Sequence, residues 1–335
     1  MKKIKTFEMF AGYGGASFAL KKAGIPFKCV GYSEIDKYAV QCYEQNHNPK
    51  RLIEFENSHS WSINFGDATK IDPGSIPDFD LLTGGFPCQP FSVAGKGLGE
   101  LDTRGTYVYD IIRIAEVKKP KYMLLENVKG LTNKNHKATF DKILSELERI
   151  GYNVTYKILN SKEHGIPQKR ERIFFFCFRR DITDGGLFAD FKVNKDYICF
   201  DFQGKEKLNI FLKDVLEDEV DEKYYLSDKQ IKALFLNSKN RRGRLPYINS
   251  KIAHCITAGD YSKVVFHNQE IIKKTSSSGE YRYRRLTPKE CFRLMGFLDD
   301  KINLYGLSNT QRYKLAGNGW DINLVSKILK EMIKQ

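Results

Sequence analysis

The most informative segment of the chain reads FDLLTGGFPCQPFS, from Phe79 to Ser92. Its apolar first part ends at Gly84-Gly85, which predicts a buried strand that stops abruptly. Two prolines then bracket Cys88, and because proline fixes φ and lacks an N–H, they hold a loop in one shape. An open α/β sheet places its chemistry on such loops at strand ends. A free cysteine is usually a small buried hydrophobe, but a core cysteine needs no such scaffold, so we interpret Cys88 as a reactive thiol.

Strand-like and helix-like segments alternate through the first 180 residues. The pattern predicts strands over 3–10, 27–33, 79–83, 122–126, 153–159 and 172–178, and helices over 16–23, 37–46, 108–117 and 140–150. Alternation of this kind is typical of a mostly parallel sheet covered by helices. We therefore expect the first half of the chain to form an α/β domain.

The pattern becomes irregular after Arg180. Charge clusters and the basic stretch KNRRGR at 239–244 indicate a second, smaller domain over 181–280. Regular helical signals return at Thr287, a predicted N-cap before Pro288 and Glu290. A last amphipathic helix carries Ile322, Val325, Ile328 and Leu329 on one face. The predicted organisation is thus 1–180, 181–280 and a returning segment, 281–335.

Composition limits the class of protein. The 335 residues are 41% hydrophobic, enough for a large core, and no apolar run reaches the roughly 20 residues of a membrane span. The basic start, 1–5, lacks the apolar region of a signal peptide, so we expect a cytoplasmic protein. The seven cysteines form no C-x-x-C pair, so we expect neither disulfides nor a metal site. The net charge of +14 favours a polyanionic partner, although basic surfaces also serve solubility.

A glycine loop links the first predicted strand to the first predicted helix. It reads FAGYGG from Phe10 to Gly15, and glycines let backbone N–H groups approach a ligand closely. Glu34 ends the second strand, where a carboxylate can bind ribose hydroxyls, and Asp67 could accept the amine of an adenine. The loop departs from G-x-G-x-x-G at Ser17, which disfavours a dinucleotide. A nucleoside-containing cofactor fits, and a structural turn is the alternative.

Taken together in order, these motifs resemble those of the DNA (cytosine-5)-methyltransferases, in their compact bacterial and phage form. The resemblance covers roughly residues 4 to 180 and 281 to 330. The matching stretches are Phe10–Gly15, Glu34, Asp67, Gly85–Ser92, Asp102–Gly105, Glu126–Val128, Gln168–Arg172, Arg285–Cys291 and Gly317–Gly319. Two departures stand out: Gly319-Trp320 in the last motif, and the unmatched segment 181–280, which in this family recognises the target.

The resemblance implies a Rossmann-like, S-adenosylmethionine-dependent methyltransferase fold, with a mixed sheet, helices on both faces and a smaller target-recognition domain. It implies transfer of a methyl group from S-adenosyl-L-methionine, leaving S-adenosyl-L-homocysteine, to C5 of a flipped-out cytosine through a bond between Cys88 and C6. The implied catalytic residues are Cys88, Glu126, Arg170 and Arg172. The implied cofactor-binding residues are Phe10, Ala11, Gly12, Tyr13, Gly14, Gly15, Glu34, Ile35, Asp67, Ala68, Pro87, Asn318 and Gly319.

The partner implied is double-stranded DNA, with no membrane. We expect a monomer, with a restriction endonuclease as a functional and not a physical partner. The candidate DNA contacts are Gln89, Ser92, Lys96, Arg104, Arg241, Arg242, Arg244, Thr257, Tyr261 and Lys263. Glycine and lysine suit a mobile loop that touches phosphate, and arginine can read guanine bidentately.

Three alternatives remain on sequence grounds. A transfer-RNA cytosine-5 methyltransferase of the same fold would carry the same catalytic motifs. A non-catalytic DNA-binding relative would keep the fold but has no need of Cys88, Glu126 and Arg172. An amino-group methyltransferase is disfavoured because its Asp/Asn-Pro-Pro-aromatic motif is absent from the sequence.

Overall fold

The computed structural model describes residues 3–48, 62–87, 107–183, 191–194, 197–236, 247–259, 270–275, 279–299 and 301–333. The chain divides into two compact units. The first unit comprises Met1–Leu159, Glu171–Gln203 and Ser326–Gln335, and the second comprises Asn160–Arg170 and Gly204–Val325.

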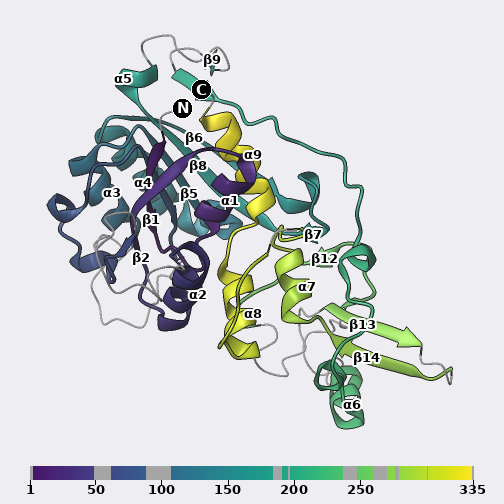
Figure 1. Cartoon of the computed structure of the whole chain (residues 1–335). Helices are drawn as coiled ribbons and strands as arrows, with labels where there is room; N and C mark the ends of the chain where they lie inside the picture. The colour runs from purple at the N-terminus through teal and green to yellow at the C-terminus, as the bar shows by residue number, and fades with distance from the viewer. Residues whose placement is uncertain are drawn as a thin grey trace, which may run out of the picture. The chain divides into compact units, whose positions relative to one another are not determined.

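A seven-stranded sheet forms the centre of the first unit (Figure 1). Its strands lie in the order β3-β2-β1-β4-β5-β8-β6, and the neighbours from β3 to β5 pair in parallel, whereas β8 runs antiparallel to β5. The strands are β1 (Ile4–Met9), β2 (Phe27–Ser33), β3 (Ile63–Asn64), β4 (Leu81–Gly85), β5 (Tyr122–Val128), β6 (Tyr152–Asn160) and β8 (Glu171–Arg179). An antiparallel hairpin of β9 (Phe191–Asn194) and β10 (Tyr197–Phe200) follows.

Helices alternate with these strands, as the sequence predicts. They are α1 (Gly15–Ala23), α2 (Lys37–His47), α3 (Val108–Lys118), α4 (Lys137–Arg149) and α5 (Arg180–Thr183), with α9 (Ile322–Met332) crossing from the second unit into the first. The predicted α/β class, with a mixed sheet and helices, is confirmed. No helix among the described residues combines the length and apolar character that a membrane span requires.

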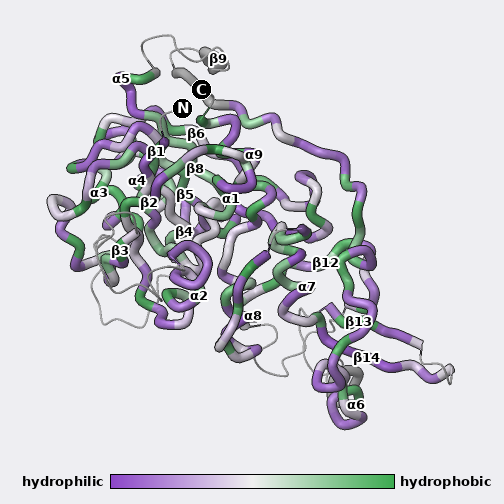
Figure 2. The backbone as a smooth tube through the Cα atoms, in the orientation of Figure 1, coloured by the Kyte–Doolittle hydropathy of each residue, from purple (hydrophilic) through white to green (hydrophobic). Residues whose placement is uncertain are grey.

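The side chains of β1 alternate between the two faces of the sheet. Phe7 and Met9 point into the main apolar core, which they share with Ile111 of α3 and Phe140 of α4. Glu8 points to the opposite face, where it meets side chains of α1 and α2. Hydrophobic residues line the central strands in Figure 2, as expected for a sheet covered on both faces.

The second unit is built from short elements. Its strands are β7 (Gln168–Lys169), β11 (Tyr247–Ile248), β12 (Ala253–His254), β13 (Glu270–Thr275) and β14 (Tyr281–Arg285), and its helices are α6 (Asp228–Leu236), α7 (Pro288–Arg293) and α8 (Asn309–Asn318). β11, β13 and β14 form one sheet, and β12 pairs with β7 in another. Sequence analysis expected 281–335 to return to the catalytic domain, but residues 281–325 pack within this second unit.

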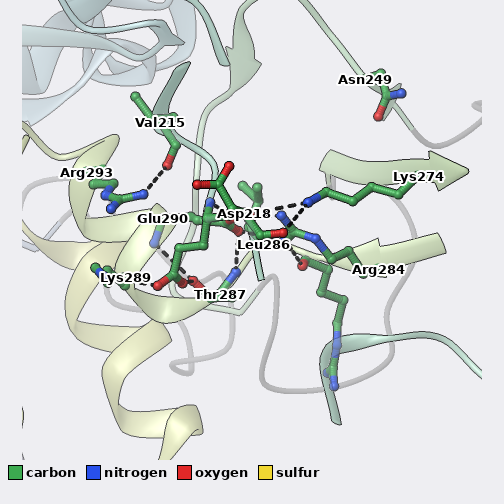
Figure 3. Close-up of polar contacts among 12 residues, drawn as sticks. Val215, Asp218, Asn249, Lys274, Arg284, Leu286, Thr287, Lys289, Glu290 and Arg293 are labelled. Atoms are coloured by element: carbon green, nitrogen blue, oxygen red, sulfur yellow. Dashed lines mark hydrogen bonds and ion pairs between the residues drawn. The ribbon is translucent and has the colours of Figure 1, made fainter. Parts of the chain in front are cut away.

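A buried ion pair explains why the segment after 281 stays in the second unit. Arg284 on β14 donates to both carboxylate oxygens of Glu290 on α7, at 2.8 and 2.7 Å, and both side chains are fully buried (Figure 3). Glu290 also accepts from the backbone N–H of Thr287 and of Glu217, at 2.7 and 2.8 Å. Thr287 completes the capping box of α7, so the predicted N-cap is confirmed.

A second buried carboxyl lies beneath the glycine loop of the first unit. Glu8 accepts hydrogen bonds from the hydroxyl of Ser17 on α1 and, at 3.3 Å, from that of Tyr43 on α2. Burial raises the pKa of Glu8 from 4.5 to about 7, against the opposing effect of these two hydrogen bonds. The first unit therefore keeps a titratable group in its interior at neutral pH.

We predict that breaking the Arg284–Glu290 pair is costly. Arg284→Met should lower the free energy of unfolding by about 3–5 kcal/mol, because it leaves a buried carboxylate without its cation. The double variant Arg284→Met/Glu290→Gln should lose less than the sum of the single variants, measured by urea unfolding. The control, Arg282→Met on the same strand, breaks an ion pair with Glu222 whose side chains are 43% and 75% exposed, and should cost less than about 1 kcal/mol.

We also predict a pH-dependent stability that originates at Glu8. Its pKa is higher in the folded state, so the folded chain binds more protons between about pH 4.5 and 7. The contribution of Glu8 to stability should therefore fall as pH rises through this window, by about 3 kcal/mol, and level off above it. His47, whose pKa is lowered to about 3, contributes in the opposite direction, so the test compares variants. Glu8→Gln should change the difference in unfolding free energy between pH 5 and pH 8, measured in urea, by about 2–3 kcal/mol relative to the unaltered protein, whereas Glu148→Gln on the exposed surface of α4 should leave that difference unchanged. An unchanged difference in Glu8→Gln would refute the assignment.

Candidate active site

Strand register brings the predicted site segments of the first unit to one edge of the sheet. Met9 pairs with Ser33 on one side and with Gly84 on the other, and Gly85 pairs with Glu126. Since parallel strands end at the same edge, the glycine loop, Glu34, the start of the Pro-Cys loop and Glu126 follow the carboxyl ends of adjacent strands. This edge is where open α/β sheets bind ligands.

The glycine loop turns sharply between β1 and α1. Phe10, Gly12 and Gly14 all have positive φ values, of 53°, 57° and 81°. The N–H of Ala11 donates to Ser33 O at 3.1 Å, and the N–H of Gly14 donates back to Ala11 O at 2.8 Å. Gly14 precedes α1 without any side-chain cap, so the loop ends at an uncapped helix N-terminus.

Glu34 is held rigidly at the end of β2. Its Oε2 accepts from the N–H of Gly12 at 2.9 Å, and its Oε1 accepts from the N–H groups of Ile35 and Asp36, each at 2.9 Å. Asn64 on β3 fixes its main chain from both sides, donating to Glu34 O at 3.1 Å and accepting from Glu34 N at 3.2 Å. The carboxylate thereby ties the glycine loop to the end of the neighbouring strand.

The other predicted cofactor contacts of the first unit differ in exposure. Ile35 is 72% exposed, an unusual state for isoleucine, whereas the side chain of Ala68 lies in the core. Asp67 caps a short 3₁₀ turn, Ala68–Lys70, by accepting from the N–H and hydroxyl of Thr69 at 3.0 and 2.8 Å. The hydroxyl of Thr69 holds the pKa of Asp67 below its usual range.

The Pro-Cys loop is anchored where it leaves the sheet. Phe86 is buried in the core, and its carbonyl accepts a 3.0 Å hydrogen bond from Nδ2 of Asn127. Asn127 is itself buried, and its Oδ1 accepts from the N–H of Val128 at 2.7 Å. Asn127 therefore orients the start of the loop. Pro87 is exposed, and Cys88 lies beyond the described residues.

Glu126 and Arg172 form a mostly buried ion pair at the same edge. Arg172 Nε lies 3.0 Å from Glu126 Oε1, and the side chains are 15% and 12% exposed. They meet because β8 is antiparallel to β5, so that Arg172, near the start of β8, pairs with Val128 at the end of β5. Two residues predicted separately from distant motifs are thus brought together.

Arg170 lies in the second unit, where it holds a turn of the chain. Its guanidinium donates to the carbonyls of Ile256, Gly317 and Gly319 at 3.0, 3.1 and 2.8 Å, and the residue is 3% exposed. Gln168, two residues earlier, accepts from the N–H of Ile256 at 3.0 Å and is also buried. Both side chains are therefore buried and hydrogen-bonded within the second unit. The catalytic role that the resemblance implies for Arg170 stays a prediction.

Gly317 lets two segments of the second unit touch. A Cβ at this position would lie 2.3 Å from the backbone carbon of Thr257, so only glycine fits. Thr257, a candidate DNA contact, is exposed beside this close approach, and Asn318 is exposed at the end of α8. The carbonyl of Gly319 is held by Arg170 at 2.8 Å.

Most candidate DNA contacts fall outside the described residues. These are Gln89, Ser92, Lys96, Arg104, Arg241, Arg242, Arg244, Tyr261 and Lys263, together with the candidate nucleophile Cys88. Within the described ranges, no cluster of three His, Cys, Asp or Glu side chains gathers as a metal site would require.

Sequence reasoning missed Asn64. Nothing in the sequence around a two-residue strand marks it, and its contribution comes from its position beside the end of β2. It fixes the main chain of Glu34 and also accepts from the N–H of Gly66 at 2.9 Å. Its role is visible only in three dimensions.

Comparison with known proteins extends across the whole chain. The family model described as "C-5 cytosine-specific DNA methylase" matches residues 4–334. A type II methyltransferase of Haemophilus aegyptius, M.HaeII, is 38% identical over 99% of this chain and 94% of its own length. M2.ScrFI, a type II methyltransferase of Lactococcus lactis subsp. cremoris, is 34% identical over 99% of both chains. The orphan methyltransferase M.SPRI of Bacillus phage SPR is 30% identical over 99% of this chain and 98% of its own.

Solved structures with a similar fold are more distant in sequence. A crystal structure of a Spodoptera frugiperda DNMT2 mutant has a TM-score of 0.76, at 21% identity, and covers 99% of this chain and 100% of its own. The S. pombe Dnmt2 methyltransferase has a TM-score of 0.72, at 21% identity, and covers 99% of both chains. These likenesses concern the fold.

Proposed function

The chain belongs to the C-5 cytosine-specific DNA methylase family, and we propose that it methylates C5 of a flipped-out cytosine through a covalent bond between Cys88 and C6. The proposed target is a cytosine within one short duplex sequence. The relatives of 30–38% identity are named as type II and orphan methyltransferases, so the proposed setting is a restriction-modification system or a phage.

One observation carries the proposal: the Glu126–Arg172 pair. It lies at the carboxyl edge of the sheet, in register with Gly85, three residues before Cys88. A carboxyl and a guanidinium fixed together provide a donor-acceptor set for the polar edge of cytosine, and their burial strengthens each interaction. A structural ion pair would not need to stand beside the end of β4, the strand that leads to the Pro-Cys-Gln-Pro loop.

The residues at this edge fit a nucleoside that carries a sulfonium, such as S-adenosylmethionine. Glu34 accepts from three backbone N–H groups, which leaves one of its roughly four lone-pair sites, on Oε2, for a ribose hydroxyl. The exposed side chain of Ile35 offers an apolar surface for a flat base, and the glycine loop offers close backbone approach. When bound, the cofactor supplies an electrophilic methyl group. Asn318 and Gly319 of the last motif are proposed as further contacts.

Cys88 begins the proposed reaction as a thiolate. Its sulfur bonds to C6, and the electron pair of the C5=C6 bond shifts towards N3, so that C5 gains enamine character. Glu126, in its protonated form, contacts N3 and the exocyclic amine and donates its proton to N3 as negative charge develops there, while Arg172 contacts O2. Arg172 also fixes the carboxyl of Glu126 through its Oε1.

The second half of the proposed reaction restores the aromatic ring. C5 takes the methyl group as the sulfonium C–S bond breaks, with its electron pair left on sulfur. A base, for which water is the simplest candidate, then removes the C5 proton. The C5=C6 bond re-forms, the S–C6 bond breaks, and Cys88 leaves as the thiolate.

The target base must leave the duplex stack for this chemistry, at a cost of a few kcal/mol. The candidate contacts that would stabilise the open state include Gln89, Ser92, Lys96 and Thr257. The net charge of +14 favours the phosphate contacts such binding needs. We place the residues that read the DNA bases, as a proposal, within 181–280.

Bisulfite sequencing of a plasmid incubated with the protein and S-adenosylmethionine tests the function. We expect protected cytosines within one short repeated sequence. Cys88→Ala should abolish protection while leaving DNA binding intact. Normal methylation by Cys88→Ala would refute the proposed mechanism. Tritium transfer to transfer RNA, with none to duplex DNA, would show that the substrate is RNA.

Two glutamates of the first unit provide a matched test of the site. Glu126→Gln should lower kcat by about 10²–10³-fold, because the neutral amide cannot supply the proton or charge that N3 requires. Glu171→Gln removes a carboxylate that pairs with Lys129 at 3.1 Å, with both side chains about half exposed, and should leave kcat within about twofold. Single-turnover methylation measures both, and equal losses would contradict the assigned role.

A further inference from the structure

His47, the last residue of α2, lies directly beneath the glycine loop. Its Nε2 is 3.0 Å from the carbonyl oxygen of Tyr13, and its Nδ1 is 3.2 Å from Nζ of Lys21 on α1. The residue thus joins the end of one helix to the loop and to the neighbouring helix. Nothing in the sequence motifs singles it out.

The two partners of the ring determine its tautomer. A carbonyl oxygen only accepts and an ammonium only donates, so Nε2 carries the proton and Nδ1 accepts. An imidazolium would turn an N–H towards the Lys21 ammonium. Burial, together with the charge of Lys21, lowers the pKa of His47 to about 3. The ring therefore stays neutral, with its N–H directed at Tyr13 O, throughout the neutral range.

The ring also fills the space next to Gly14. A Cβ placed on Gly14 would lie 2.3 Å from His47 Nε2, and Gly14 has a φ of 81°. Phe18 and Tyr43 hold the ring in place, with centroid distances of 4.6 and 4.7 Å. The imidazole is therefore fixed on two sides and presses against the turn of the loop.

Two hydrogen bonds fix the peptide group between Tyr13 and Gly14. The carbonyl of Tyr13 is held by His47, and the N–H of Gly14 in the same peptide donates to Ala11 O at 2.8 Å. That peptide is thus held at both ends, one residue before α1 begins. Its orientation sets the direction of the neighbouring N–H groups of the loop.

We propose that His47 is a positioning residue for the cofactor: its Nε2–H holds the Tyr13–Gly14 peptide, and with it the glycine loop, in the conformation that binds S-adenosylmethionine. The inference rests on the proposed function of that loop. His47 acts through the backbone of the loop and touches no reacting atom.

Two substitutions separate the hydrogen bond from the packing. His47→Phe keeps a ring between Phe18 and Tyr43 but has no donor, whereas His47→Gln keeps an amide N–H donor without the ring. We expect His47→Phe to weaken S-adenosylhomocysteine binding, measured by calorimetry, by about tenfold, since the hydrogen bond from Nε2 to the carbonyl of Tyr13 is lost. His47→Gln should stay within about threefold of the unaltered protein.

The kinetic readout distinguishes positioning from general damage. In His47→Phe the KM for S-adenosylmethionine should rise about tenfold while kcat and the Kd for duplex DNA stay within about twofold. His136→Phe, which alters a histidine remote from the loop in sequence, is the control and should change none of these. Should His47→Phe fail to fold, His47→Leu replaces it.

Each other outcome overturns the inference. Normal cofactor binding by His47→Phe would show that the loop needs no donor. Equal weakening in the Phe and Gln variants would show that a donor at this position does not by itself hold the loop. Failure of the unaltered protein itself to bind S-adenosylhomocysteine would refute the proposed function of the loop and this inference with it, whereas normal binding by every variant would refute the inference alone.

Discussion

The antiparallel course of β8 is the constraint on which the site depends. A parallel strand in that place would carry its first residues to the opposite edge of the sheet. Because β8 runs against β5, Arg172 reaches the end of β5 and its guanidinium lies 3.0 Å from Glu126. The mixed sheet therefore places the guanidinium of Arg172 at the edge where the parallel strands end in the loops and in Glu126.

Local signals were strong enough to predict much of this arrangement. The glycine loop, Glu34 and the Pro-Cys loop each follow an apolar strand, and strand ends in parallel register must share an edge. Thr287, Pro288 and Glu290 predicted a helix start because capping is decided within four residues. The sequence did not reveal that Glu290 would also hold Arg284, since that pairing depends on how β14 packs against α7.

The remaining features depend on contacts between distant residues. Arg170 binds carbonyls of Gly317 and Gly319, and a carbonyl carries no sequence identity from which its partner could be inferred. Asn64 and His47 also bind backbone atoms, so their partners could not be inferred from the sequence either. The expected return of 281–335 to the first domain rested on local helical signals, whereas the packing of 281–325 depends on buried polar contacts within the second unit.

The chain passes between the two units four times, and the short segment Asn160–Arg170 belongs to the second unit although its neighbours on both sides belong to the first. Gln168 and Arg170 in that segment hold Ile256 and the 317–319 turn. Residues 204–325 therefore depend on contacts with the separate segment Asn160–Arg170. If residues 181–280 recognise the target as proposed, an exchange of that segment between relatives would have to include Asn160–Arg170 or keep the carbonyls that Arg170 binds in place.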